Sequence, residues 1–174
     1  ISEKIRVPIN GVQQGMFIVG RDTRNPVLLF LHGGTAMPEY VFTQRYPTGL
    51  EQYFIVSWWD RRGAGLSYSA DIPPETMTLE QSIADTIEVT NYLRSRFGQE
   101  KIFLMAHSGG SLIGIQAAAR APQLYGAYIG IIRFDMGLMG GIKGFSAAVV
   151  GGLGNIYGAI FGGLLLGEIL IVLV

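Results

Sequence analysis

Ser108 is the residue of this sequence best placed to act as a nucleophile. A short apolar run at residues 102–105 predicts a buried strand, and from Ser111 onward the apolar residues recur with a helical period. Ser108 therefore falls on the turn between a strand and a helix. Ala106 and Gly110 flank it at two residues on either side. We expect a turn so sharp that a larger side chain at either position would collide where the strand and helix backbones pass.

A serine hydroxyl needs a proton acceptor near neutral pH, usually a histidine held in place by a carboxylate. The sequence has two histidines, His32 and His107, and none follows Ser108. We expect His32, at the end of a predicted strand, to be a hydrogen-bonded structural group. His107 adjoins Ser108, and the sharp turn should aim its ring elsewhere. We interpret Asp135, beyond the last predicted strand, as a boundary charge rather than a catalytic acid.

Composition excludes several other kinds of site. Thirteen Lys and Arg balance thirteen Asp and Glu, so no basic field attracts nucleic acid or anionic lipid. The absence of cysteine excludes thiol nucleophiles, disulfides and zinc-thiolate sites. Gly63 and Gly65 begin a phosphate-loop pattern, but Tyr68 stands where a third glycine is needed. We predict no cofactor, no bound metal and no nucleic-acid partner.

Residues 1–6 carry no apolar signal core, so we expect no export signal.

Strands and helices alternate over residues 1–131. Thr78 and Gln81 have the spacing of a capping box, which predicts a helix start, and Gly98 ends that helix. Continuous apolar runs predict strands buried on both faces, as in a parallel sheet. The predicted strands cover residues 5–7, 14–19, 27–31, 54–58, 102–105 and 127–131, with a turn at 10–11 between the first two. The pattern predicts an α/β fold, a mostly parallel sheet with helices on both faces.

Residues 9–131 resemble the prolyl iminopeptidase branch of the α/β-hydrolase family. The resemblance rests on three loops that each follow a predicted strand, namely LHGG at 31–34, WDRRGAGLS at 59–67 and HSGG at 107–110. The three loops together are much more specific than any one of them.

This resemblance implies Ser108 as the nucleophile and the backbone N–H groups of Gly34 and Gly109 as the oxyanion hole. It also implies small peptides or esters as substrates, because members of this branch remove N-terminal residues, often proline. The supporting residues of the three loops are His32, Gly33, Asp60 and His107.

The sequence also departs from the family pattern. Thr35 and Ala36 follow the paired glycines in place of Pro-Gly, Arg61 replaces a glutamine, and Gly109 stands where a tryptophan is common. In this fold the acid and the histidine of the triad follow the nucleophile, and both are missing after Ser108. We therefore expect a truncated serine hydrolase of the aminopeptidase type, inactive as given.

The composition changes near residues 130–134. Of the 26 charged residues 22 precede residue 132, whereas 11 of the 25 glycines lie in the last 43 residues. Residues 144–167 carry no charge, and such a stretch is long enough to span a bilayer core of about 30 Å. Its glycines recur every four residues, as in closely packed membrane helices. We predict a partial α/β-hydrolase domain at 1–131 and an apolar, glycine-rich segment at 132–174, a candidate transmembrane or re-entrant helix.

This second segment has a resemblance of its own. Residues 132–167 resemble part of the permease subunit of branched-chain amino-acid ABC transporters, which implies a fusion of two incomplete genes. The alternative hypothesis is therefore a membrane-embedded permease fragment that carries the hydrolase portion as a passenger. A buried glycine-rich segment or an unstable tail would give the same composition. We expect the hydrolase portion to be cytoplasmic, with membrane association through 144–174; the sequence does not indicate an oligomeric state.

Overall fold

The computed structural model describes residues 1–34 and 38–131. The chain divides into two units, Ile1–Ile132 and Arg133–Val174, and the described residues all belong to the first. The predicted apolar helix within 144–174 and the boundary charge at 135 fall outside the described residues. Among the residues that are described, no helix is both long and apolar enough to cross a membrane.

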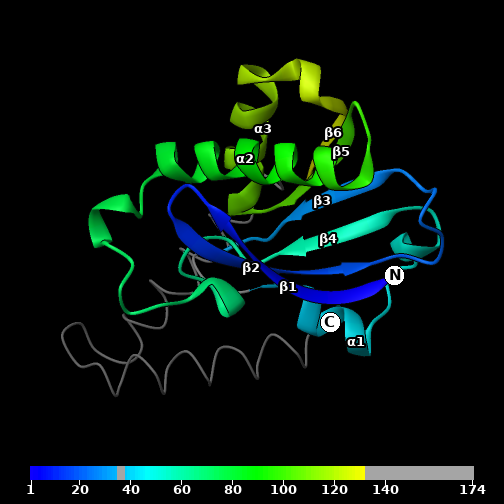
Figure 1. Cartoon of the computed structure of the whole chain (residues 1–174), viewed down its shortest axis with the longest axis horizontal. Helices are drawn as coiled ribbons and strands as arrows, with labels where there is room; N and C mark the ends of the chain where they lie inside the picture. Colours follow the sequence, from blue (N-terminus) through cyan, green and yellow to red (C-terminus); the bar gives the residue numbers. More distant parts are fainter. Residues whose placement is uncertain (35–37, 132–174) are drawn as a thin grey trace, which may run out of the picture. The chain divides into compact units, whose positions relative to one another are not determined.

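The described unit is built on a mixed sheet (Figure 1). Its strands are β1 Ser2–Ile9, β2 Val12–Val19, β3 Val27–Leu31, β4 Ile55–Trp59, β5 Ile102–His107 and β6 Tyr125–Ile131, in the order β1-β2-β4-β3-β5-β6. The pairs β4–β3, β3–β5 and β5–β6 are parallel, whereas β1–β2 and β2–β4 are antiparallel. The mostly parallel sheet is thus confirmed.

The first two strands are longer than the sequence patterns predict. Their turn lies at Asn10 and Gly11, as expected, and both residues have positive φ, 43° and 82°. Such a two-residue turn matches the twist of the flanking strands and fixes their register. In β1 exposed and more buried residues alternate, so Lys4 and Arg6 face water while Val7 and Ile9 enter the core. This alternation extends the strand beyond its apolar residues.

Three α-helices and several short turns connect the strands in the described ranges. The helices are α1 Tyr40–Arg45, α2 Leu79–Phe97 and α3 Gly109–Arg120, and the 3-10 turns are Leu50–Gln52, Gly65–Ser67, Pro74–Thr76 and Pro122–Leu124. At the start of α2 the Thr78 hydroxyl accepts a hydrogen bond from the Gln81 N–H at 3.1 Å. The reciprocal half of the predicted capping box is absent, because the Gln81 side chain donates to Asp85 instead. Gly98 ends the helix with φ 62°, as predicted.

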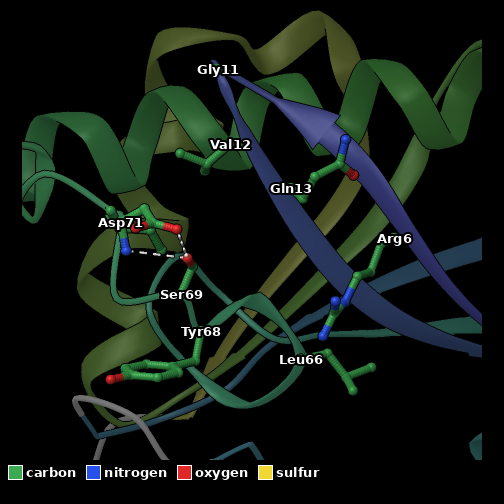
Figure 2. A pocket seen from close by; sticks show the side chains of 9 residues that line it. Arg6, Gly11, Val12, Gln13, Leu66, Tyr68, Ser69 and Asp71 are labelled. Carbon is green, nitrogen blue, oxygen red and sulfur yellow. Dashed lines mark hydrogen bonds between the residues drawn. The ribbon is translucent and has the colours of Figure 1, made fainter.

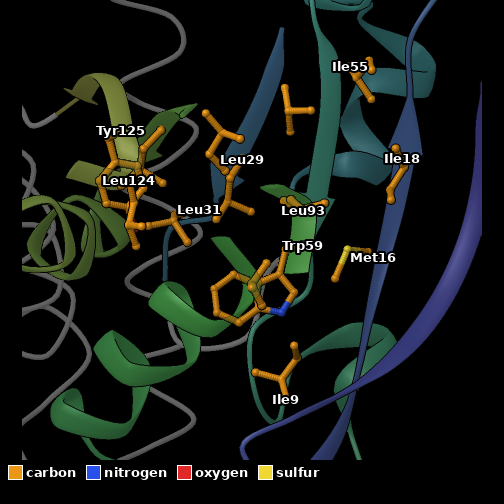
Figure 3. Packing of buried hydrophobic residues seen from close by; sticks show 14 of the residues in the cluster. Ile9, Met16, Ile18, Leu29, Leu31, Ile55, Trp59, Leu93, Leu124 and Tyr125 are labelled. Carbon is orange, nitrogen blue, oxygen red and sulfur yellow. The ribbon is translucent and has the colours of Figure 1, made fainter. Parts of the chain in front are cut away.

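Hydrophobic residues pack on both faces of the sheet. Leu29, Leu31 and Trp59 point toward the face covered by α2 and contribute to one core with its Leu93 (Figure 3). The alternate strand residues, Leu28, Phe30, Val56 and Trp58, form a second core with Tyr40 of α1 on the opposite face. Because side chains alternate along a strand, a strand buried on both faces needs apolar residues at every position. Helices on both faces are therefore confirmed.

The parallel strands bring three predicted loops to one edge of the sheet. The register pairs Leu31 with Trp59 and with Ala106, so β3, β4 and β5 end at nearly the same level. The residues that follow these strands, beginning at His32, Asp60 and Ser108, therefore share the carboxyl edge, where ligands bind in open α/β sheets.

Candidate active site

Ser108 occupies a strained backbone conformation between β5 and α3. Its φ is 51° and its ψ is −123°, a region that residues with a Cβ rarely adopt. Such strain costs about 1–3 kcal/mol and persists only where the surrounding structure imposes it. Ser108 is half-buried rather than enclosed. The turn thus presents a serine at the edge of the sheet.

The small residues around Ser108 are needed for two different reasons. An added Cβ at Gly110 would lie 2.6 Å from the carbonyl oxygen of His32, so α3 crosses directly over the end of β3. We expected Gly110 to pack against β5, the strand that precedes Ser108. It packs instead against the end of β3, which is paired with β5. Ala106 meets α3 as predicted, since its Cβ lies 3.2 Å from a Cβ added at Gly114.

The two predicted oxyanion residues lie side by side. An added Cβ at Gly109 would be 3.8 Å from the backbone nitrogen of Gly34, which has φ 60°. The preceding Gly33 packs so closely on the elbow that its Cβ would lie 2.9 Å from the Ser108 Cβ. The loop after β3 therefore rests against the nucleophile turn, and both Gly34 and Gly109 are exposed.

His32 is buried and neutral. Its Nδ1 is 2.8 Å from the Gly33 carbonyl oxygen, and its Nε2 accepts a hydrogen bond from the Arg61 N–H at 3.1 Å. Together these bonds select the tautomer with the proton on Nδ1. Burial, helped by the charge of Arg61, lowers the pKa of His32 to about 4. This imidazole connects the loops after β3 and β4 and fits the structural role predicted for it.

His107 points toward Glu39, a residue that the sequence analysis did not single out. The His107 Nδ1 lies 2.5 Å from Glu39 Oε1, and the same oxygen accepts a hydrogen bond from the Gly33 N–H at 3.2 Å. One carboxylate oxygen thus joins the loop after β3 to the residue directly before the nucleophile. The His107 ring thus contacts Glu39, in line with the prediction that the turn aims this ring away from Ser108.

Asp60 is buried and organises its own loop. Its Oδ2 accepts a hydrogen bond from the Leu66 N–H at 2.7 Å, and a Cβ at Gly65 would collide with this oxygen at 2.2 Å. Burial raises the pKa of Asp60, although the Leu66 hydrogen bond and the charge of Lys4 oppose the rise. Asp60 therefore holds the turn 61–67 closed, and we assign it a supporting role.

No proton acceptor is bound to Ser108 in the part of the chain that the structure describes. The hydrogen bonds of His32 go to Gly33 and Arg61, and that of His107 goes to Glu39. Over residues 1–34 and 38–131 no group of three or more His, Asp or Glu side chains is arranged to hold a metal ion. In the described ranges, the site thus contains Ser108 beside the backbone of Gly34 and Gly109.

Arg61 is the second residue that the motifs did not identify as part of the site. Its Nη2 donates a hydrogen bond of 2.9 Å to the carbonyl oxygen of Gly34, so the loop after β4 holds the predicted oxyanion loop. Its place in the family motif, where glutamine is usual, was the available signal. Its contact with Gly34 depends on the pairing of β3 with β4.

Two cavities of similar size open on the described unit. One, of about 400 Å³, lies between the β1–β2 hairpin and the loop after β4, where Arg6, Tyr68 and Asp71 surround it (Figure 2). It contains none of the predicted site residues. The other, of about 390 Å³, reaches Gly34 and is lined also by Arg61. Of these two cavities, the second is the one that reaches the predicted oxyanion residue Gly34.

Comparisons with known proteins match this arrangement. A family model described as serine aminopeptidase, S33, matches residues 26–132. The protein named "Probable aminopeptidase YbaC" from Bacillus subtilis strain 168 is 43% identical over 123 residues, which cover 71% of this chain and 39% of that protein. The chain therefore spans well under two thirds of this curated relative.

Solved structures of other hydrolases have a similar fold. A proline iminopeptidase-related protein from Thermus thermophilus is 27% identical with a TM-score of 0.64, over 87% of this chain and 51% of that chain. An epoxide hydrolase from Vigna radiata is also 27% identical, with a TM-score of 0.61, over 76% of this chain and 39% of that chain. These similarities lend no support to the permease resemblance of residues 132–174.

Proposed function

This chain belongs to the serine aminopeptidase S33 family of α/β-hydrolases, and on that premise we propose that Ser108 is the nucleophile of an acyl-transfer site. Its substrates are small peptides that react at their N-terminal residue, or small esters and amides. The observation that carries this proposal is the positive φ of Ser108 at the junction of β5 and α3. A serine in that conformation is costly unless the strain serves to present its hydroxyl.

The adjacent backbone supplies the electrostatic part of the site. When the Ser108 oxygen attacks a carbonyl carbon, negative charge develops on the carbonyl oxygen. The N–H groups of Gly34 and Gly109 are the donors for that charge, and their side-by-side placement supports this assignment. Removing one such donor in other enzymes costs about 10²–10³ in kcat. Glycine at both positions leaves the backbone open to the substrate.

The same geometry supports a serine that can react slowly and once with a strong electrophile, its proton passing to solvent water, but that does not turn over substrate. The attack releases the serine proton, and a histidine near the hydroxyl normally accepts it. In this polypeptide His32 uses both ring nitrogens in hydrogen bonds, and the Nδ1 of His107 is bound to Glu39. We infer that the 174-residue polypeptide by itself does not hydrolyse amino-acid arylamides.

A fluorophosphonate probe tests the nucleophile, because the serine oxygen displaces fluoride from phosphorus while the hydroxyl proton passes to solvent. The phosphonyl ester that forms is stable and remains on the protein. We expect mass spectrometry to find the label on Ser108 and Ser108→Ala to abolish it. Ser69→Ala is the matched control, since Ser69 is exposed and lies away from the elbow. Equal labelling of wild type and Ser108→Ala would refute the nucleophile. Turnover of prolyl arylamide that Ser108→Ala abolishes would refute the inactivity.

A further inference from the structure

The cavity beside the predicted oxyanion loop has the size of a subsite for a small group. Its volume is about 390 Å³, and its walls come from elements far apart in the sequence. The lining residues come from the loops after β3 and β4, from the start of α2 and from α3, namely Gly34, Arg61, Arg62, Met77, Thr78, Leu79, Ser82 and Ile113. The cavity therefore reaches from the predicted oxyanion loop to the start of α2 and to α3.

Arg61 brings an unpaired positive charge to this cavity. Its Nη2 is bound to a neutral carbonyl oxygen, that of Gly34, and its Nε is buried with no hydrogen-bond partner in the described ranges. None of the ion pairs within those ranges includes Arg61. The neighbouring Arg62, in contrast, is paired with Asp85. A guanidinium keeps its charge in proteins, and a planar donor group of this kind fits a carboxylate well.

One acidic residue is near enough to affect Arg61. The charge of Glu39 acts on the Arg61 guanidinium, but Glu39 binds His107 and Gly33 and does not line the cavity. The N-terminus of α2 adds to the positive character of the walls, because the partial charge at a helix start favours an anion. The described lining contains no carboxylate, so an entering anion meets no like charge there.

The distance from the reacting centre restricts the ligand. Gly34 offers its N–H to the expected oxyanion and accepts a 2.9 Å hydrogen bond from Arg61 Nη2 at its carbonyl oxygen, so the guanidinium is bound to the same residue that would face the oxyanion. In a dipeptide the free carboxylate belongs to the residue directly after the scissile bond, about 3.8 Å from its predecessor between Cα atoms. Each further residue would move that carboxylate away by about 3.5 Å.

We propose that this cavity is a subsite for the C-terminal carboxylate of dipeptides and that Arg61 is its specificity-determining residue. The proposal rests on the acyl-transfer function assigned to Ser108, whose leaving group this carboxylate would belong to. It makes Arg61 the cause of a preference for short peptides with a free acid end.

Equilibrium binding tests the subsite without requiring any reaction. In a Ser108→Ala background, isothermal titration calorimetry compares prolylalanine, its C-terminal amide prolylalaninamide, and the tripeptide prolylalanylalanine. We expect the dipeptide acid to bind about tenfold more tightly than the amide, because a hydrogen bond to a charged group is stronger than one to a neutral group. The tripeptide acid should bind more weakly than the dipeptide acid, because its carboxylate lies farther from the scissile bond. The advantage of the dipeptide acid over its amide should fall with added salt.

Two variants assign the effect to Arg61. Arg61→Gln should bind the acid and the amide equally, whereas Arg120→Gln, at an exposed ion pair with Glu80 outside the cavity, should keep the preference. Equal binding of acid and amide by the protein with Arg61 intact would overturn the proposal, and so would a preference that survives Arg61→Gln. Fluorophosphonate labelling tests Ser108 separately. If the wild type is not labelled but the dipeptide acid still binds more tightly than the amide, Ser108 is not the nucleophile and the carboxylate subsite still stands.

Discussion

Arg62 and Asp85 form a buried ion pair, in which Nε lies 2.7 Å from Oδ2 and both side chains are almost inaccessible to water. Asn10, Gln14 and Gln81 each donate a further hydrogen bond of 2.8 Å to the same carboxylate. Burial alone would raise the pKa of Asp85, but the hydrogen bond from Arg62 and these three together outweigh it and hold the pKa below its ordinary value. The carboxylate thus ties the β1–β2 hairpin and the loop after β4 to α2.

Removing this carboxylate should destabilise the fold strongly. Asp85→Asn leaves the Arg62 charge buried without compensation, and such a loss costs about 3–5 kcal/mol. Urea denaturation followed by far-UV circular dichroism measures the change in the free energy of unfolding. Glu80→Gln is the control, because Glu80 is paired with Arg120 on the exposed surface, and we expect its denaturation midpoint to match that of wild type. A similar midpoint for both variants would contradict the structural role of Asp85.

His32 should make the stability of the chain depend on pH in a defined window. The folded imidazole has a pKa of about 4, lowered by burial, whereas an unfolded one has a pKa of about 6.5. Between these values the unfolded state binds more protons, so the free energy of unfolding falls as the pH decreases from about 6.5 to about 4. The fall attributable to His32 is about 3 kcal/mol.

Denaturation curves at several pH values check this window. His32→Asn removes the titrating group, so the decrease in unfolding free energy between about pH 6.5 and about pH 4 should be smaller than in wild type. The contribution of Asp85 has the same sign but lies at lower pH, because the pKa of Asp85 is held below its ordinary value. Parallel pH curves for wild type and His32→Asn would show that the folded imidazole titrates normally.

Neighbouring glycines at the elbow should respond differently to alanine. A Cβ at Gly110 would meet the carbonyl oxygens of His32 and Leu31 at 2.6 and 2.7 Å, and backbone atoms in a sheet cannot yield easily. Gly110→Ala should therefore cost about 1–3 kcal/mol or more. Gly109→Ala is the matched control in the same helix, because its Cβ would have ordinary contacts at 3.8 Å or beyond. Thermal melting compares the two, and equal melting temperatures would argue against the close crossing of α3 over β3.

Glu39 should affect the reactivity of Ser108 without touching it. Glu39→Ala frees both the Gly33 N–H and the His107 ring, so the oxyanion loop loses its link to the elbow. We expect the rate of fluorophosphonate labelling to fall by about ten- to a hundred-fold, as small misplacements in active sites do. Glu75→Ala, at an exposed residue, should label at the wild-type rate. Circular dichroism on both variants separates lost geometry from unfolding, and an unchanged rate for Glu39→Ala would remove Glu39 from the site.

Local sequence patterns were sufficient for much of the fold and for the nucleophile. The apolar run at 27–31 predicts the bounds of β3 without error, because a strand buried on both faces leaves a continuous signal. Ser108 could be found because a strand, small residues and a helix meet there within a few positions. In these cases the residues that determine the structure are neighbours in the chain.

The rest depends on residues that lie far apart in the sequence. Glu39 and His107 are separated by 68 positions, and neither flanks the other in any motif. The hydrogen bond from Arg61 to the Gly34 carbonyl oxygen likewise requires β3 and β4 to be paired first. A capping box was predicted at Gln81, but the buried carboxylate of Asp85 attracts the Gln81 side chain more strongly than the helix start does.

The order of the strands has a consequence for synthesis on the ribosome. β3 is central in the described sheet, yet both of its partners, β4 and β5, are encoded after it. The nascent apolar run at Val27–Leu31 therefore leaves the exit tunnel before either partner can satisfy its backbone amides. Parallel strands that are distant in the sequence pair slowly, and until they pair their apolar surface is exposed and prone to aggregate. The yield of native polypeptide should therefore depend on chaperone capacity during translation.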